Sequence, residues 1–123
     1  MPNIYHITSR AEWDAAQASG SYRAPSLDKE GFIHCSTAKQ VVPVANAFYR
    51  GQSGLVLLCI DPAQVQPDVR FEPPVHPQTG QLEPEKPDLF PHIYGALNIG
   101  AVVDVLPLTP NSGGMFALPE GIA

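Results

Sequence analysis

The sequence predicts an α+β fold, and two observations support that prediction. The helical patterns lie in the first half of the chain, whereas most of the strand patterns lie in the second half. This separation favours an α+β fold over an alternating doubly wound one. A chain of 123 residues with 44% hydrophobic residues can bury a core without disulfide or metal staples. We therefore predict a single domain over residues 1–123, with its core at about residues 3–108.

The first predicted element is a strand over residues 3–8, where Ile, Tyr and Thr residues are close together. Ser9 follows this strand, and Glu12 lies three residues later, which is the spacing of a capping box. A short helix is therefore predicted over residues 10–18. The next segment, residues 21–30, has the composition of a loop.

A second strand is predicted over residues 31–36, "GFIHCS". Thr37 is the expected cap of a second helix over residues 38–50, in which apolar residues recur at helical spacing. Pro43 falls inside this pattern, so we expect the helix to begin near it, because proline is tolerated in a first turn.

The second half of the chain is predicted to consist mainly of strands. The segment of residues 54–61 is almost wholly apolar, so its strand should be covered on both faces. Residues 73–91 contain many prolines and several acidic residues, which predicts a surface loop and a candidate lid. Further strands are expected at residues 67–73, 92–98 and 100–108, and a Gly- and Pro-rich tail at 109–123 is a candidate for mobility.

Charge and composition exclude several classes of function. The formal net charge is −5, and the seven Lys and Arg residues are scattered singly, so we expect neither long nucleic acid nor an anionic membrane as a partner. The N-terminal residues do not resemble a signal peptide, and the longest apolar run is too short to span a bilayer. The two cysteines match no metal spacing, which is typical of reduced thiols in a cytoplasmic protein.

Side-chain alternation along the predicted strands groups polar residues on one face. His6 and Thr8 share a face of the first strand, His34 and Ser36 share a face of the second, and His92 shares a face with Tyr94. Three separate strands thus each carry a histidine with a hydroxyl two residues later. This repetition predicts that the three histidines line one cleft, with Cys35 facing the core instead.

Other interpretations of these residues remain open. A half-buried histidine is often structural, and each of the three histidines has that alternative. A zinc site is disfavoured because no two ligands are close in sequence. A cysteine nucleophile is disfavoured because His34 and Cys35 are adjacent and point to opposite faces. Glu72 ends a strand, where it is either a solvated carboxylate or an acid/base group at the mouth of the cleft.

The segments "IYHIT", "GFIHCST", "VANAFYRG", "LVLLCID" and "FPHIYGALN" resemble the bacterial domain-of-unknown-function family 952, over about residues 3–106. That resemblance implies a fold similar to that of the ADP-ribosyltransferases, with two small, mainly antiparallel sheets around an NAD cleft and two short helices. "YHIT" is similar to the first-strand motif of the diphtheria-toxin type. "FIHCST" is similar to a cleft strand of the RNA 2′-phosphotransferases, with His34 and Ser36 at matching positions.

The resemblance implies that the cleft binds NAD or a related nucleotide, without a metal, and that it transfers or hydrolyses ADP-ribose. His6 and Glu72 would hold the ribose, with Thr8 beside His6. His34, Ser36 and Thr37 would contact the nicotinamide side or the phosphates, and His92 and Tyr94 would complete the wall. The candidate catalytic residues are therefore His34, Glu72 and His92. Two alternatives stay open, a non-catalytic nucleotide- or small-ligand-binding module and a metal-dependent hydrolase using the three histidines.

Overall fold

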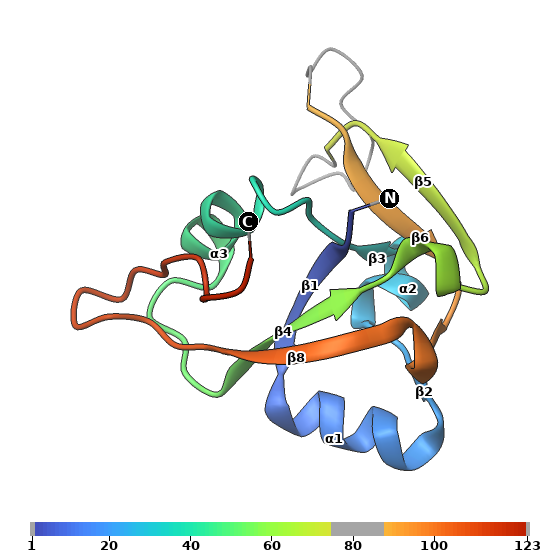
Figure 1. Ribbon diagram of the computed structural model, residues 1–123, viewed down its shortest axis with the longest axis horizontal. Helices are drawn as coiled ribbons and strands as arrows, with labels where there is room; N and C mark the ends of the chain where they lie inside the picture. The colour runs from blue at the N-terminus through green and yellow to red at the C-terminus, as the bar shows by residue number, and fades with distance from the viewer. Residues whose placement is uncertain (1, 75–87, 123) are drawn as a thin grey trace.

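The computed structural model describes residues 2–74 and 88–122 (Figure 1). Its central sheet consists of three antiparallel strands in the order β1 (Ile4–Ser9), β4 (Leu55–Ile60) and β8 (Val102–Leu108). All six residues of β4 are buried, which confirms the prediction that this strand is covered on both faces. Its apolar sequence follows from that position, because neither face meets water.

Two hydrophobic clusters cover the opposite faces of the central sheet. One face carries Val56, Leu58 and Ile60, which pack with Trp13 and Ala16 of α1 (Arg10–Ser19). The other face carries Leu55, Leu57 and Cys59, which pack with Val41 and Ala45 of α3 (Val41–Phe48). The alternation of side chains along β4 therefore places one of these two helices against each face.

A second antiparallel sheet shares the cluster that contains α1. Its strands lie in the order β3 (Ile33–His34), β6 (Phe90–Tyr94) and β5 (Asp68–Glu72). Ile33 and Ile93 are fully buried in that cluster, beside β4 residues. A third pair, β2 (Ser21–Tyr22) with β7 (Leu97–Asn98), completes an α+β arrangement of small antiparallel sheets. The class is as expected, but the described residues form three sheets rather than two.

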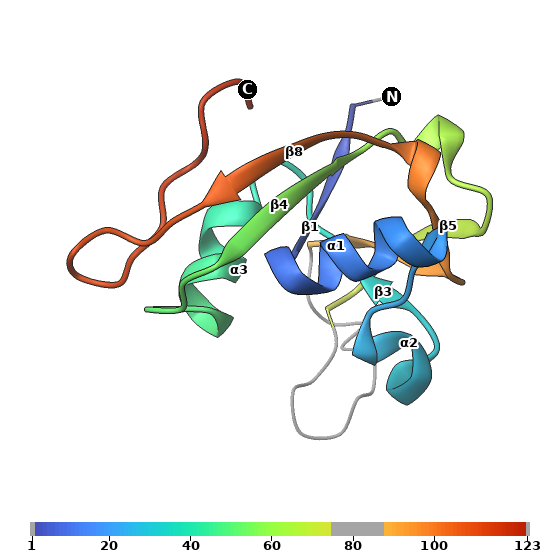
Figure 2. The same ribbon diagram turned by 90° about the horizontal axis from the view of Figure 1, so that it is seen from below.

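The helices are more numerous than expected. Residues 21–30 do not form a loop, since they contain β2 and α2 (Pro25–Glu30), so the described chain has three α-helices rather than two. Proline in the first turn of α2 favours helix initiation because its missing N–H needs no partner there. Helices α1, α2 and α3 can be followed in Figure 2. Two short 3-10 turns, Pro62–Gln64 and Ile99–Ala101, connect strands.

Several boundaries also differ from the prediction. Helix α3 begins at Val41, with Pro43 in its first turn as expected, but its N-cap is Gln40 and not Thr37. The strand predicted at residues 31–36 is reduced to Ile33–His34 and an isolated bridge at Ser36. The start of α1 agrees with the prediction, because the Ser9 hydroxyl accepts a hydrogen bond from the Glu12 N–H at 3.1 Å.

The loop predicted at residues 73–91 ends earlier than expected, and the C-terminal tail packs against the fold. Residues 90 and 91, assigned above to the loop of residues 73–91, belong to β6, while residues 75–87 and the lid prediction lie outside the described residues. The C-terminal tail docks onto α3, since the Phe116 side chain is buried and its N–H donates to Asn46 Oδ1 at 2.7 Å. In the described parts of the chain, no helix is long and apolar enough to cross a membrane.

Candidate functional site

The candidate site lies where the two larger sheets separate. Tyr5 of β1 and Ser36 exchange two main-chain hydrogen bonds of 2.8 and 2.7 Å, which join the sheets at one point. In a continued antiparallel ladder, the next pair to exchange hydrogen bonds would be Ile7 and His34. Instead, the carbonyl oxygen of His34 accepts from His6 Nδ1 at 2.5 Å. The His6 side chain thus takes the place that the Ile7 N–H would have as the donor to His34. The ladder between β1 and β3 ends at this point.

This separation leaves the outer edge of β1 open. Tyr5 directs its N–H and C=O away from β4, and alternation directs the same groups of Ile7 to the same side. No described residue makes a main-chain hydrogen bond to Ile7 on that side. Ile7 therefore presents one donor and one acceptor beside the opening between the sheets.

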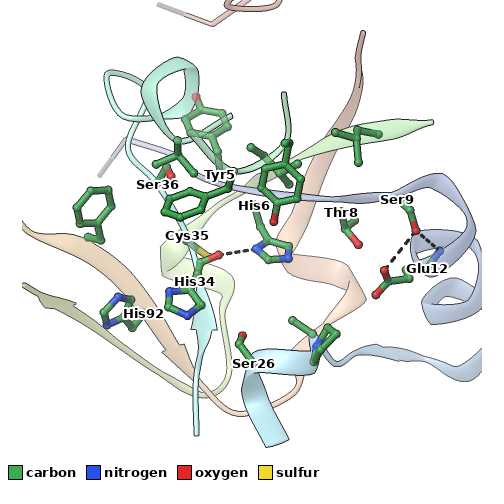
Figure 3. A pocket seen from close by; sticks show the side chains of 18 of the residues that line it. Tyr5, His6, Thr8, Ser9, Glu12, Ser26, His34, Cys35, Ser36 and His92 are labelled. Atoms are coloured by element: carbon green, nitrogen blue, oxygen red, sulfur yellow. Dashed lines mark hydrogen bonds between the residues drawn. The ribbon is translucent and has the colours of Figure 1, made fainter. Parts of the chain in front are cut away.

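A cavity of about 660 Å³ occupies the opening, a size typical of small-molecule sites. Figure 3 shows His34 and His92 together at one side, Ser9 and Glu12 at the other, and His6 between them. The described residues that line the cavity are Tyr5, His6, Ile7, Thr8, Ser9, Glu12, Tyr22, Ala24, Pro25, Ser26, Glu30, His34, Cys35, Ser36, Val44, Phe48, Tyr49, Gln52, Leu55, Pro74, Phe90 and His92. The prediction that the three histidines line one cavity is confirmed.

Burial of polar side chains is concentrated at this cavity. Apart from tyrosine, tryptophan and cysteine, the buried polar residues of the described chain are His6, Thr8, Ser36 and His92. All four line the cavity. Buried polar groups are costly unless they are hydrogen-bonded, so their concentration in one place needs a structural or functional reason.

For His6 and Thr8, the reason is a hydrogen-bonded chain through Tyr22. Because a carbonyl can only accept, His6 Nδ1 carries the proton that bonds the His34 oxygen. Burial lowers the pKa of His6 to about 4, so the ring is neutral and its Nε2 is an acceptor. The Tyr22 hydroxyl lies 2.8 Å from that nitrogen and 3.0 Å from Thr8 Oγ1. Tyr22 therefore donates to His6 and accepts from Thr8.

His34 belongs to a carboxylate–imidazole pair at the exposed side of the cavity. Its Nε2 donates to the carboxylate of Glu30, the last residue of α2. The side chain of His34 is 44% exposed and that of Glu30 is 28% exposed, so both are accessible to a ligand. The pair forms because Gly31, at φ 89°, turns the chain from α2 into β3 within four residues.

His92 belongs to a second pair on the adjacent strand. Its Nδ1 donates to Glu72 Oε1 at 2.8 Å, and the same oxygen accepts from the Tyr94 hydroxyl at 2.5 Å. Burial lowers the pKa of His92 more than Glu72 raises it, so the ring is neutral at pH 7. Burial raises the pKa of Glu72, but the hydrogen bonds from Tyr94 and His92 outweigh it and leave that pKa below its usual value. Burial and the bond to Glu72 raise the pKa of Tyr94 to about 12.

The Phe32 ring packs against the histidines of both pairs. Its ring stacks on His92 with centroids 4.1 Å apart and meets His34 edge to face at 5.0 Å. The centroid of the Tyr94 ring lies 5.3 Å from that of Phe32. Phe32 is 5% exposed, so the imidazoles rest on a buried aromatic support.

The structure brings most of the predicted site residues together, but not all of them. His6, Thr8, His34, Ser36 and His92 line the cavity. Glu72 and Tyr94 are not among the described lining residues. Glu72 accepts a hydrogen bond from His92, and Tyr94 donates to the same oxygen of Glu72. Thr37 instead lines a separate, smaller hollow, so it is separated from the site. The roles assigned to these residues stay predictions.

Sequence reasoning missed several residues that the structure adds to the site, among them Glu30, Tyr22 and Ser26. They lie in the segment assigned to a loop, so their orientation could not be predicted. A usable signal existed for Glu30, because it lies four residues before His34 with a glycine between them. Among the described residues, no group of three or more His, Cys, Asp or Glu side chains has an arrangement that could hold a metal ion.

Both cysteines are buried and unbridged, as predicted. Cys35 packs in the cluster that includes Ile33 and Ile93, as expected, but it also lines the cavity and so does not face the core alone. Burial raises the pKa of the Cys35 thiol far above its usual value. Burial, with a contribution from Asp104, raises the pKa of Cys59 to about 11. Neither thiol has the depressed pKa of a reactive nucleophile.

Solved structures with a similar fold include two of protein CC0527. The X-ray structure of protein CC0527 from Caulobacter crescentus shares 33% identity and a TM-score of 0.78, with 94% of each chain covered. The solution NMR structure of the same protein shares 34% identity and a TM-score of 0.74, covering 94% of this chain and 91% of that one. No curated protein matches the chain significantly.

Residues 7–105 match the family described as "Protein of unknown function (DUF952)". The matched segment includes both carboxylate–imidazole pairs and the open edge of β1. The chain therefore belongs to the DUF952 family.

Proposed function

We propose that the cavity is an ADP-ribosyltransferase-like cleft that binds the nicotinamide–ribose half of NAD or of a related pyridine nucleotide. The observation that carries the proposal is the open edge of β1 at Ile7. The N–H and C=O of Ile7, which have no main-chain partner among the described residues on that side, offer a donor and an acceptor side by side, which matches the primary carboxamide of nicotinamide. Aromatic and aliphatic lining residues provide surfaces for the pyridine ring.

The position of His6 changes the role that the resemblance implied for it. Both of its ring nitrogens have protein partners, so His6 has no hydrogen-bonding atom left for a ribose hydroxyl. In the proposal it is a positioning residue, which keeps β1 and β3 apart and leaves the main chain of Ile7 facing the cavity. The ribose would instead contact Ser36 and the pair formed by His34 and Glu30.

A catalytic form of the proposal is hydrolysis of the bond between nicotinamide and ribose. The bonding electron pair leaves with nicotinamide, and the oxygen of a water molecule bonds to the ribose carbon. His34 accepts the proton of that water, and Glu30 stabilises the resulting imidazolium. The products are nicotinamide, ADP-ribose and one proton.

The non-catalytic binding module remains the second candidate, because one specific observation favours it. Glu72, the candidate catalytic carboxylate, accepts two hydrogen bonds behind His92 and is not part of the described lining. A carboxylate in that position supports the wall and does not reach a ribose. Release of free nicotinamide from NAD by the purified protein distinguishes the two forms. Release would also show that NAD binds, whereas its absence leaves binding to be measured separately.

Thermal unfolding with and without NAD tests the binding proposal. A ligand at a hundredfold excess over its Kd stabilises the native state by about 2.7 kcal/mol. We expect NAD to raise the unfolding temperature of the wild type, and the rise to shrink in His34→Gln. Asp68→Asn is the control, since this exposed carboxylate belongs to the same sheet but does not line the cavity. A wild type that is unmoved by millimolar NAD would contradict the proposal.

A further inference from the structure

The charged side chains among the described lining residues of the cavity are all acidic. Glu12 and Glu30 line it, whereas none of its described lining residues is Lys or Arg. Two of the arginines are engaged elsewhere, because Arg23 pairs with Asp28 at 2.7 Å and Arg70 pairs with Asp68 at 3.6 Å. Lys39 lines the separate smaller hollow, and Lys86 lies outside the described residues. A phosphate inside the cavity would therefore meet two carboxylates and no described cation.

The remaining lining is rich in aromatic rings. Five tyrosine or phenylalanine residues contribute to it, namely Tyr5, Tyr22, Phe48, Tyr49 and Phe90. Phe48 is 64% exposed on α3, which places an aromatic ring at the mouth. Aromatic rings combined with carboxylates and no cation are the features that recognise organic cations, since the face of an aromatic ring attracts positive charge.

From these observations we infer that the cavity selects a positively charged aromatic ring, the N-ribosylated pyridinium, and that Glu30 is the residue that determines this selectivity. The inference rests on the proposed function and names the half of the nucleotide that enters. The carboxylate of Glu30 is fixed by His34 and remains 28% exposed, so a cationic ring can approach it without displacing a buried partner. The diphosphate and the adenylate would lie outside the cavity.

Two ligands that differ mainly in charge provide the test. Nicotinamide riboside carries the pyridinium charge, whereas its reduced dihydropyridine form is uncharged and nearly the same size. We expect calorimetric titration of the wild type to give a Kd for the oxidised form that is about tenfold lower than for the reduced form, the size of effect that one charge pair near a surface can produce.

Two variants test whether Glu30 determines the preference for the oxidised riboside. In Glu30→Gln the preference for the oxidised form should fall to less than about threefold, because the amide has no net charge. In Asp28→Asn it should be unchanged. Asp28 lies on the same helix but its side chain is 72% exposed, pairs with Arg23 and does not line the cavity. Both exchanges change exposed groups, and thermal unfolding of each variant checks that it is folded.

The outcomes separate the inference from the proposed function. Equal affinity of the wild type for the two ribosides would overturn the inference, as would a preference that persists in Glu30→Gln. ADP-ribose binding as tightly as NAD would show that the other half of the nucleotide is recognised, which overturns the inference while the proposed function stands. No binding of NAD or of either riboside would remove the proposed function and the inference together.

Discussion

The imidazoles of His34 and His92 meet edge to face with their ring centroids 5.5 Å apart, and each donates to a different carboxylate. Neighbouring strands bring the rings together, since His34 of β3 is directly opposite His92 of β6. Their environments differ, because the side chain of His92 is 1% exposed and that of His34 is 44% exposed. The pair of His92 and Glu72 is thus mostly buried and supports the cavity wall. The pair of His34 and Glu30 is more exposed and accessible from the cavity.

Removing the ring beneath these imidazoles should destabilise the protein strongly. Phe32→Ala deletes a buried ring that contacts both histidines, and we expect it to lower the free energy of unfolding by about 3–5 kcal/mol. The matched control is Phe48→Ala, whose ring is 64% exposed and which should change that free energy by less than about 0.5 kcal/mol. Urea unfolding of both variants measures the difference, and similar losses would refute the supporting role of Phe32.

Loss of the Tyr22 hydroxyl should leave His6 Nε2 without its partner. Tyr22→Phe keeps the ring but removes the group between His6 and Thr8, at an expected cost of about 1–3 kcal/mol in the free energy of unfolding. Tyr49→Phe is the control, because the Tyr49 hydroxyl makes no hydrogen bond to a described residue. Chemical unfolding of both variants compares the two hydroxyls. Equal effects would argue against the hydrogen-bonded chain.

His6 should make stability depend on pH in the acid range. Its pKa is about 4 in the folded protein, against 6.5 for an exposed histidine, so between these values the unfolded chain binds more protons. The contribution of His6 is fully present above about pH 6.5 and is lost as the pH falls towards 4, with a total of about 3 kcal/mol. Unfolding free energies measured from pH 7 to pH 4 should show this loss.

The variant His6→Gln identifies the source of that dependence. Glutamine does not titrate, so the loss between pH 6.5 and 4 should be smaller in the variant even though the variant is less stable at pH 7. Part of the loss should remain, because the lowered pKa values of His92 and Glu72 act in the same direction. An unchanged pH dependence would show that the pKa of His6 is not lowered in the native protein.

The two thiols should be unreactive until the chain unfolds. Cys35 and Cys59 are each 4% exposed, and burial raises both pKa values. We expect a thiol reagent to label almost none of the native protein within minutes and two thiols per chain after denaturation. Rapid labelling of native Cys35 would reopen its interpretation as a nucleophile.

Alternation along strands predicted the site better than the local signals predicted helices. The prediction that His6, His34 and His92 line one cavity followed from the two-residue period of strands, which is a property of single segments. The separation of faces was not complete, because Tyr5, Ile7 and Cys35 of the opposite face also line the cavity. The helix α2 could not be predicted because six residues carry too little periodicity, and its only start signal, Pro25, is equally common in turns. Glu30 was missed for that reason.

The partners of His6 depend on contacts between distant segments. Its hydrogen bond to the His34 carbonyl spans 28 residues, and that to Tyr22 spans 16 residues. Neither contact has a local sequence signature, so a structural role for His6 and a ligand-binding role were equally consistent with the sequence. The end of the ladder between β1 and β3, which creates the cavity, could not be predicted for the same reason.

A crystal structure of the protein grown with NAD tests the central claim most directly. We predict that the nicotinamide ring occupies the cavity, with its carboxamide hydrogen-bonded to the N–H and C=O of Ile7 and its ribose beside His34 and Glu30. The diphosphate should lie outside the cavity. Nicotinamide bound elsewhere on the surface, or a cavity holding only solvent at NAD concentrations that saturate binding in solution, would contradict the account.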